Sequence, residues 1–345
     1  MKNTSFFLLL LSFVLISFFN CESNAEPETP EIPEEPQVIK SNFIFDEVYT
    51  FEAGLFGGPN IGMIGSTSDN SLFISCRENN PASSITEEET IKLNLDTNQV
   101  TRKNSSPGGF GTKQLRIVED QLISIGGDQL KTFDLDLANA SANTNYSTNY
   151  SFVLSNFGIA SDNENTYIIG GYRIDIATRE NKKIYKLNIN SSELFEEVVD
   201  TPETMLGASG AVVNGKIYVF GGVVYENIEA TNKIYIYPLD NPANYEELSM
   251  SVKADVTFVH KYGEIIFIAG YKGLYGGGEK TSFIAKFDTN TNTFEEIEQN
   301  IDSEGGVKAI HQMIIKDDKM YILYGHEGIW PTFISDWSVL VSDLY

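Results

Sequence analysis

The chain has 345 residues, of which 48 are acidic and 24 are basic, so its formal net charge at pH 7 is −24. Such an acidic surface repels nucleic acid and anionic membranes, which excludes nucleic acid as an expected partner, and it favours solubility. The chain has only two cysteines, so a disulfide-rich scaffold is also excluded. A folded domain must therefore be stabilised by its packed core.

The first twenty residues have the pattern of a secretory signal peptide. Lys2 supplies a positive charge, and Phe6 to Phe19 form an apolar run that is short for a membrane span. Cys21 follows directly, which resembles a bacterial lipoprotein, in which the cysteine is lipidated and becomes the mature N-terminus. Cleavage after Ala25 by ordinary signal peptidase is the alternative. We expect residues 1–20 to be a signal peptide and Cys21 to carry the lipid.

Residues 21–40 are rich in Glu and Pro and poor in apolar side chains, which predicts an extended, disordered tether. The acidic residues just after Cys21 resemble the export signal of surface lipoproteins in Bacteroidota. This resemblance implies an exported protein held to the outer membrane by its lipid alone and displayed on the cell surface. A periplasmic or secreted soluble protein is the alternative. Residues 41–345 are then the folded domain.

One motif recurs throughout residues 41–345: an apolar strand that ends in glycines. The clearest copy is NGKIYVFGG, which ends at Gly222. The intervals between successive copies run from 44 to 55 residues, which suits propeller blades with loops of variable length better than a stacked solenoid. The other copies end at Cys76, Gly127, Gly171, Gly270 and Gly325.

Each unit contains more than this one strand. An apolar run and a turn precede it, as in residues 207–216, and an alternating strand follows, as in residues 233–240. In three units a polar turn and a strand with an aromatic residue and acids come next, as in residues 242–249. Alternating β-branched and aromatic residues predict strands. Six such units predict an all-β, six-bladed β-propeller with four-stranded antiparallel blades.

The repeat resembles the kelch motif, whose hallmarks are a diglycine, a later tyrosine and an aromatic residue further on. The resemblance covers residues 42–345, and its marks in the fourth unit are Gly221 and Gly222, Tyr235 or Tyr237, and Tyr245. It implies a kelch-type propeller. Kelch proteins include metal-free enzymes of the sialic-acid epimerase (mutarotase) type. The glycines themselves are expected to be structural, because backbones without a Cβ can approach closely.

The two ends of the domain predict how the ring closes. The last unit ends with SDWSVLVSDLY, which is its third strand, and no sequence remains for a fourth. Residues Asn42 to Val48 read as a strand that lacks three predecessors. We therefore expect this N-terminal strand to be the outer strand of the last blade.

The segments after the glycines are expected to lie on one face of the propeller, because strand direction alternates within a blade. Tyrosines, arginines and acids that converge there suit a sugar or an extended polypeptide. Exposed loop residues are polar in any case, which is the competing interpretation. The predicted ligand-binding residues are Arg77, Tyr172, Arg173, Tyr225, Glu226, Tyr271, Lys272, Tyr275, His326, Glu327 and Trp330.

Neither a metal site nor a cofactor is predicted. The three histidines lack the spacing of metal ligands. Asp288 begins a DTNTN stretch that mimics the start of a calcium loop but lacks its glycine and distal glutamate. Phosphate loops, dinucleotide fingerprints and nucleophile elbows are also missing.

The leading functional hypothesis is non-catalytic binding of a glycan or an envelope protein. The alternative is an enzyme of the sialic-acid epimerase type, with Glu226 and Arg173, or His326 and Glu327, near the axis. A third hypothesis is that the protein is a scaffold subunit of an envelope complex.

Overall fold

The structure is a computed structural model in which residues Ile39–Tyr345 form one unit. The signal peptide and residues 21–37 of the tether, with Cys21, lie outside the described residues, as do Tyr275, Glu327 and Trp330. Among the described residues there is no helix, and hence none that could cross a membrane. The described residues are 38–51, 55–56, 61–80, 85–105, 114–126, 129–139, 144–145, 154–162, 164–173, 176, 180–189, 191, 194–272, 281–301, 308–326 and 337–345.

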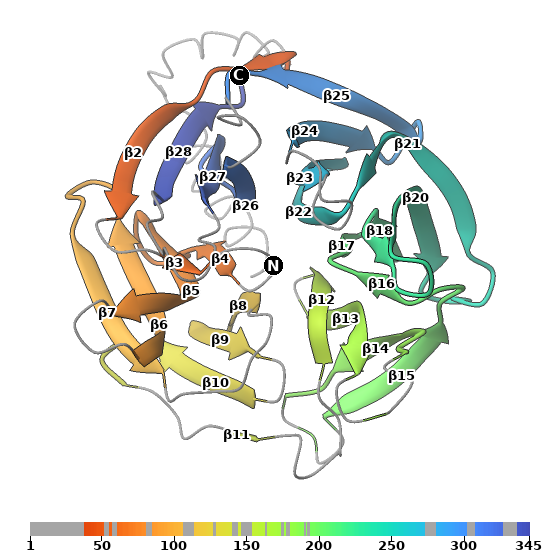
Figure 1. The fold of residues 1–345 in the computed structure, drawn as a ribbon, viewed down its shortest axis with the longest axis horizontal. Coiled ribbons are helices and arrows are strands. Elements are labelled where there is room, and N and C mark those ends of the chain that lie inside the picture. The colour runs from red at the N-terminus through yellow and green to blue at the C-terminus, as the bar shows by residue number, and fades with distance from the viewer. Residues whose placement is uncertain are drawn as a thin grey trace, which may run out of the picture. The chain divides into compact units, whose positions relative to one another are not determined.

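Six small sheets surround an axis and form a six-bladed β-propeller, as the repeat predicts (Figure 1). The innermost strand of each blade is the first in its unit, and pairing within each unit is antiparallel. In the first three blades the strands are β3 (Leu55–Phe56), β4 (Gly62–Gly65), β5 (Ser71–Asn80), β6 (Ile85–Asn94) and β7 (Val100–Ser105); β8 (Gln114–Val118), β9 (Gln121–Ile125), β10 (Gln129–Asp134) and β11 (Thr144–Asn145); and β12 (Leu154–Ser161), β13 (Thr166–Arg173), β14 (Lys183–Leu187) and β15 (Phe195–Asp200).

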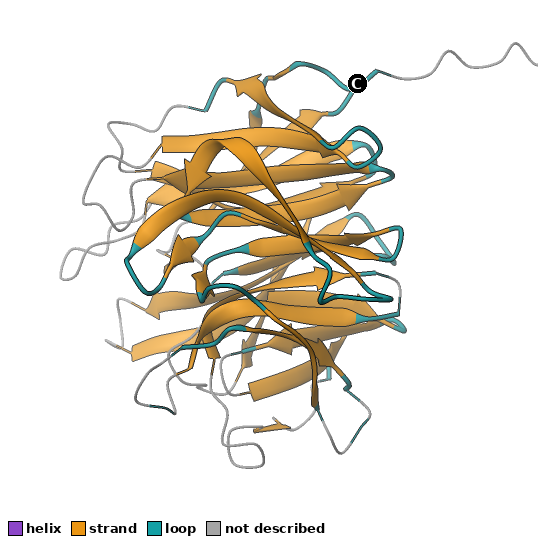
Figure 2. Cartoon of the chain, turned by 90° about the vertical axis from the view of Figure 1, so that its right-hand side faces the viewer, coloured by secondary structure: helices purple, strands orange, loops and turns teal. Residues whose placement is uncertain are grey.

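The other three blades follow the same order from the axis outward, and Figure 2 shows the strands of the propeller from the side. Blade 4 contains two short strands, β16 and β19, in addition to its four longer ones; β16 pairs with β19, and β19 pairs with β20. The strands are β16 (Met205–Leu206), β17 (Ser209–Val213), β18 (Lys216–Phe220), β19 (Val223–Val224), β20 (Glu229–Pro238) and β21 (Glu246–Ala254); β22 (Val256–Tyr262), β23 (Ile265–Lys272), β24 (Thr281–Asp288) and β25 (Thr293–Gln299); and β26 (Lys308–Lys316), β27 (Lys319–His326) and β28 (Trp337–Asp343), with β1 (Asn42–Phe43) and β2 (Asp46–Phe51) added from the N-terminus.

The hydrophobic core lies between neighbouring blades. One cluster joins Phe220 and Ile234 of blade 4 to Ile266 and Phe283 of blade 5. A central strand therefore packs on both faces, and β18 is buried continuously after its first residue instead of in alternation. Cys76 replaces the diglycine in the first unit. Its thiol is buried in the core.

The paired glycines mark close approaches between backbones, as predicted. Gly170 and Gly171 have φ values of +58° and +80°. A Cβ on Gly170 would lie 2.2 Å from the carbonyl oxygen of Met205 in blade 4. Gly222, with a φ of +95°, donates its N–H to the carbonyl of Ala254 at 2.9 Å. The diglycines therefore let neighbouring segments pack where a side chain would collide.

The segment at Asp288 is a turn, as expected. Its carboxylate accepts the backbone N–H groups of Asn290 at 2.8 Å and Thr291 at 3.3 Å. These bonds stabilise the connection between β24 and β25, in which Asn292 has a φ of +56°. Among the described residues no group of histidine, cysteine and acidic side chains could hold a metal ion.

The N-terminal segment closes the ring, as predicted, but it does so over two blades. β2 pairs antiparallel with β28 as the outer strand of blade 6, with Phe51 opposite Trp337. β1 pairs in parallel with β25 at the outer edge of blade 5. The closing strand thus starts at Asp46 rather than Asn42, because Phe43 is buried against Phe267 in blade 5.

Candidate functional site

The strands of blade 3 define the two ends of the propeller. Ser161 pairs with Thr166 at the hairpin between β12 and β13, whereas Ser155 pairs with Tyr172 at the opposite end of these strands. We call the first the hairpin end and the second the diglycine end. Because six residues separate Ser155 from Ser161, the two ends are about 20 Å apart along β12.

Two predicted tyrosines meet at the diglycine end, between blades 3 and 4. The rings of Tyr172 and Tyr225 are stacked, with centroids 6.1 Å apart and an angle of 17° between their planes. Tyr172 lies near the end of β13, and the N–H of Tyr225 donates to the carbonyl of Thr204 at 2.9 Å. Both side chains are half-buried, so part of each ring remains accessible.

An ion pair lies beside the tyrosines. Lys182 Nζ is 2.8 Å from Glu226 Oε1, and the same oxygen accepts the N–H of Thr204 at 3.3 Å. Burial acts to raise the pKa of Glu226, but the hydrogen bond from Lys182 and the backbone N–H groups outweigh it and lower that pKa. The hydrogen bond to Glu226 raises the pKa of Lys182. Both groups are therefore charged at neutral pH.

Polar contacts behind these residues fix their positions. Asn181 is 2% exposed, donates to the carbonyl of Gly170 at 2.6 Å and accepts from Tyr185 Oη at 3.2 Å. Tyr235 Oη donates to Glu203 at 2.7 Å, next to Thr204. Asn181 and Lys182 are not among the predicted residues, because they lie directly before the third strand and not directly after a diglycine. Their position before that strand is the only sequence feature that points to them.

The structure thus brings three predicted residues, Tyr172, Tyr225 and Glu226, to one place. Arg173 follows Tyr172 at the end of β13 and is half-buried, but successive side chains of a strand point to opposite faces, so Arg173 is not counted with them. We call this group, together with Lys182, the tyrosine-pair site and define it as Tyr172, Lys182, Tyr225 and Glu226.

The other predicted residues lie in different blades. Lys272 is exposed at the end of β23, whereas Tyr271 is 0% exposed and its ring is 5.6 Å from that of His311. Tyr271 therefore belongs to the core and not to an accessible surface. The backbone of Arg77 lies in β5 opposite Glu88, and that of His326 ends β27 opposite Lys308.

The tyrosine-pair site offers flat aromatic surface with fixed charges of both signs. Aromatic faces stack on sugar rings or on apolar peptide side chains, while carboxylate and ammonium groups bind hydroxyl and amide groups. Glu226 is already ionised and paired, so it is poorly suited to donate a proton at neutral pH. The geometry therefore favours recognition over proton transfer.

Comparison of the chain with protein-family models finds no match, and comparison with curated proteins finds none either.

Proposed function

We propose that this chain is an exported kelch-type propeller that binds a glycan or an envelope protein through its diglycine end, without catalysing a reaction. The stacked pair of Tyr172 and Tyr225, held across the interface between two blades, is the observation that carries the proposal. Half-buried tyrosines supported by ordered polar contacts are typical of recognition surfaces, since they contribute large contact area at little entropic cost.

Assignment to the kelch type rests on blades 3 and 4. Both blades have a positive-φ diglycine at the end of the second strand. In blade 4 the buried Tyr235 of the third strand packs edge-on against Tyr245, with ring centroids 5.8 Å apart. This is the tyrosine and the later aromatic residue that the motif leads us to expect.

The epimerase alternative requires an acid and a base that exchange protons near neutral pH. Glu226 departs from that requirement because its pKa is lowered, whereas a general acid needs a raised one. This direction supports binding as the leading proposal.

The test is a thermal-shift screen of a soluble form that begins at Ile39, the start of the compact unit. The panel contains monosaccharides including sialic acid, and oligosaccharides from host and plant glycans. A ligand at about a hundred times its Kd adds roughly 2.7 kcal/mol, which is a measurable rise in Tm. Capture of an envelope protein from the native membrane is the parallel arm for a protein partner.

Variants then assign any ligand to the tyrosine-pair site. Tyr172→Ala and Tyr225→Ala should each weaken binding about tenfold. Tyr245→Ala is the matched control, because Tyr245 is a 39% exposed tyrosine on the outer strand side of blade 4. Equal losses for all three variants would contradict the assignment.

We also propose that Cys21 carries the lipid anchor, with the acidic tether between it and the propeller. The signal-like run before Cys21 and the Glu- and Pro-rich segment after it support this proposal. The mass of the mature N-terminus measured from membranes is the test. A diacylated or triacylated Cys21 is expected, whereas a mature chain starting at Glu26 would show ordinary signal-peptidase cleavage.

A further inference from the structure

A pocket lies at the hairpin end of the propeller, remote from the tyrosine-pair site. It has a volume of about 380 Å³ and lies among the innermost strands β12, β17 and β22. We call it the axial pocket. That volume is in the range of small-molecule sites. Its walls include Ser161, Asp162, Ala211, His260 and Lys261.

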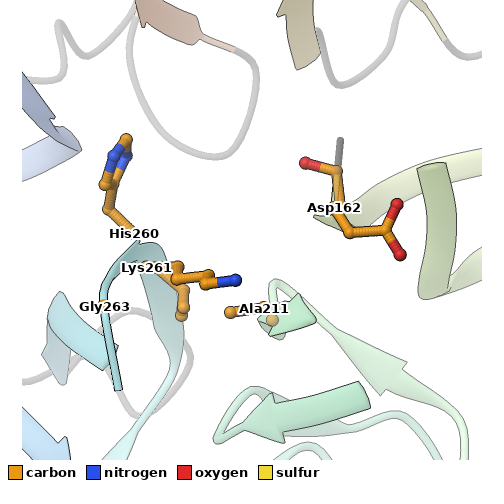
Figure 3. Close-up of a pocket in the computed structure, with 8 residues that line it drawn as sticks. Asp162, Ala211, His260, Lys261 and Gly263 are labelled. Atoms are coloured by element: carbon orange, nitrogen blue, oxygen red, sulfur yellow. The ribbon is translucent and has the colours of Figure 1, made fainter. Parts of the chain in front are cut away.

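Three side chains with hydrogen-bond donors line this space, half-buried Ser161 and His260 and exposed Lys261. Among the described residues, the side chains of Ser161, His260 and Lys261 make no hydrogen bond or ion pair. Figure 3 shows Lys261 reaching from β22 toward Ala211 of β17, with His260 on the same strand. Burial lowers the pKa of His260 to about 4, so at neutral pH its ring is uncharged and has one N–H donor.

The carboxylates near the pocket are already occupied by protein donors. Asp162 Oδ1 accepts the N–H of Asn165 at 2.6 Å and that of Glu164 at 2.8 Å. In Figure 3 this carboxylate points away from His260 and Lys261. Glu264, which follows Gly263 of the pocket wall, accepts from Asn214 Nδ2 at 2.6 Å.

A buried cation adds positive potential behind the wall. Arg116 of β8 is 5% exposed and donates to the backbone carbonyls of Asp162 at 2.5 Å and Asn165 at 2.8 Å. Its Nε has no hydrogen-bond partner, and within the described part of the chain the guanidinium forms no ion pair. The Asp162 carboxylate also interacts with this charge, although burial lowers the pKa of Arg116 by more than that carboxylate raises it. Lys261 and Arg116 are thus two positive charges beside the one negative charge of Asp162.

From these observations we propose that the axial pocket binds a small oxyanion, a carboxylate or a phosphate, held by Lys261, Ser161 and His260. Lys261, Ser161 and His260 offer N–H or O–H donors, the Asp162 carboxylate is hydrogen-bonded within its own turn, and the two cations Lys261 and Arg116 lie at or behind the wall. A cation would be repelled by Lys261, and a neutral apolar ligand would leave the half-buried donors of Ser161 and His260 without a partner, which is costly. The site is independent of the tyrosine-pair site, since it lies at the other end of the strands.

The test follows the ring signals of the three histidines by NMR while sodium phosphate or sodium malonate is added. Sodium chloride of equal ionic strength is the reference, and the His260→Gln variant assigns the His260 signal. The expected result is a saturable shift of that signal with phosphate, malonate or both, and none with chloride. The two arms distinguish a phosphate site from a carboxylate site.

Variants of Lys261 test whether the anion binds in the axial pocket. Lys261→Met should weaken binding about tenfold or more, because a charge-assisted hydrogen bond is lost. Lys261→Arg should retain measurable binding. Lys253→Met is the matched control, since Lys253 is an exposed lysine of β21 without an ion pair among the described residues. Shifts that track chloride, or equal binding by Lys261→Met and the wild type, would overturn the proposal.

Discussion

Gly170 shows how one absent side chain determines the spacing of two blades. Its φ of +58° is almost the same as the +59° of Gly263, but their surroundings differ. A Cβ on Gly170 would lie 2.2 Å from the carbonyl oxygen of Met205, whereas one on Gly263 would have nothing within 4 Å. Substitution at Gly263 therefore introduces backbone strain alone, whereas substitution at Gly170 introduces strain and a steric collision.

We predict that Gly170→Ala lowers the free energy of unfolding by about 3 kcal/mol or more, because strain at positive φ adds to a collision with the next blade. Gly263→Ala should cost only about 1 kcal/mol, from strain alone. Urea denaturation of both variants measures the difference. Equal losses would mean that the diglycine does not set the distance between blades.

Tyr271 gives a second test at the level of a single residue. It is 0% exposed, whereas its neighbour Lys272 is exposed. Tyr271→Ala should therefore lower stability by about 3–5 kcal/mol through the cavity it creates. Lys272→Ala should change stability by no more than about 0.5 kcal/mol. A stable Tyr271→Ala protein in the same denaturation experiment would contradict its place in the core.

His260 predicts a pH dependence of stability. Its pKa is about 4 in the folded state, against about 6.5 in an unfolded chain. The unfolded state therefore binds more protons between these values, so stability is full above pH 6.5 and falls as the pH decreases toward 4. The slope from this residue is at most about 1.4 kcal/mol per pH unit. His260→Gln should flatten that part of the curve, and an unchanged slope would exclude His260 as its source.

The elements could be predicted from the sequence to different degrees. Strands such as Lys216–Phe220 follow from their apolar run between the Asn214–Gly215 turn and the diglycine. The predicted closing strand begins four residues before the observed one, because alternation in residues 42–48 cannot show that Phe43 packs on a different blade from Phe51. The sequence does not predict the pairing of Lys182 with Glu226 for the same reason, since this pairing depends on how two blades meet.

The N-terminal segment therefore joins blades 5 and 6, like a clasp, by pairing with the outer strand of each. Phe43 is 0% exposed and the adjacent Ile44 is 64% exposed, so they form a matched pair. Phe43→Ala should cost about 3–5 kcal/mol, whereas Ile44→Ala should be nearly neutral. Because ring closure is cooperative, the Tm of the whole domain should fall in a single transition. A separate early transition would show that the clasp opens independently of the other blades.

At the scale of the whole molecule, the outer strands concentrate the negative charge. Blades 3, 4 and 5 share one arrangement, in which a lysine of the third strand pairs with a glutamate of the fourth. The pairs are Lys183 with Glu197 at 2.5 Å, Lys233 with Glu247 at 3.6 Å and Lys286 with Glu295 at 3.2 Å. In each blade a second glutamate adjoins the paired one, so the outer strands keep an excess of negative charge.

This excess predicts that moderate salt stabilises the protein. Exposed ion pairs contribute little, whereas repulsion among unpaired acids in a chain of charge −24 opposes folding. Raising sodium chloride from about 10 mM to about 150 mM shortens the screening length to about 8 Å and should raise the Tm by about 2 °C or more. Joint replacement of Glu196, Glu246 and Glu296 by glutamine should raise the Tm at low salt and weaken its salt dependence. A Tm that falls with added salt would mean that the ion pairs outweigh the repulsion.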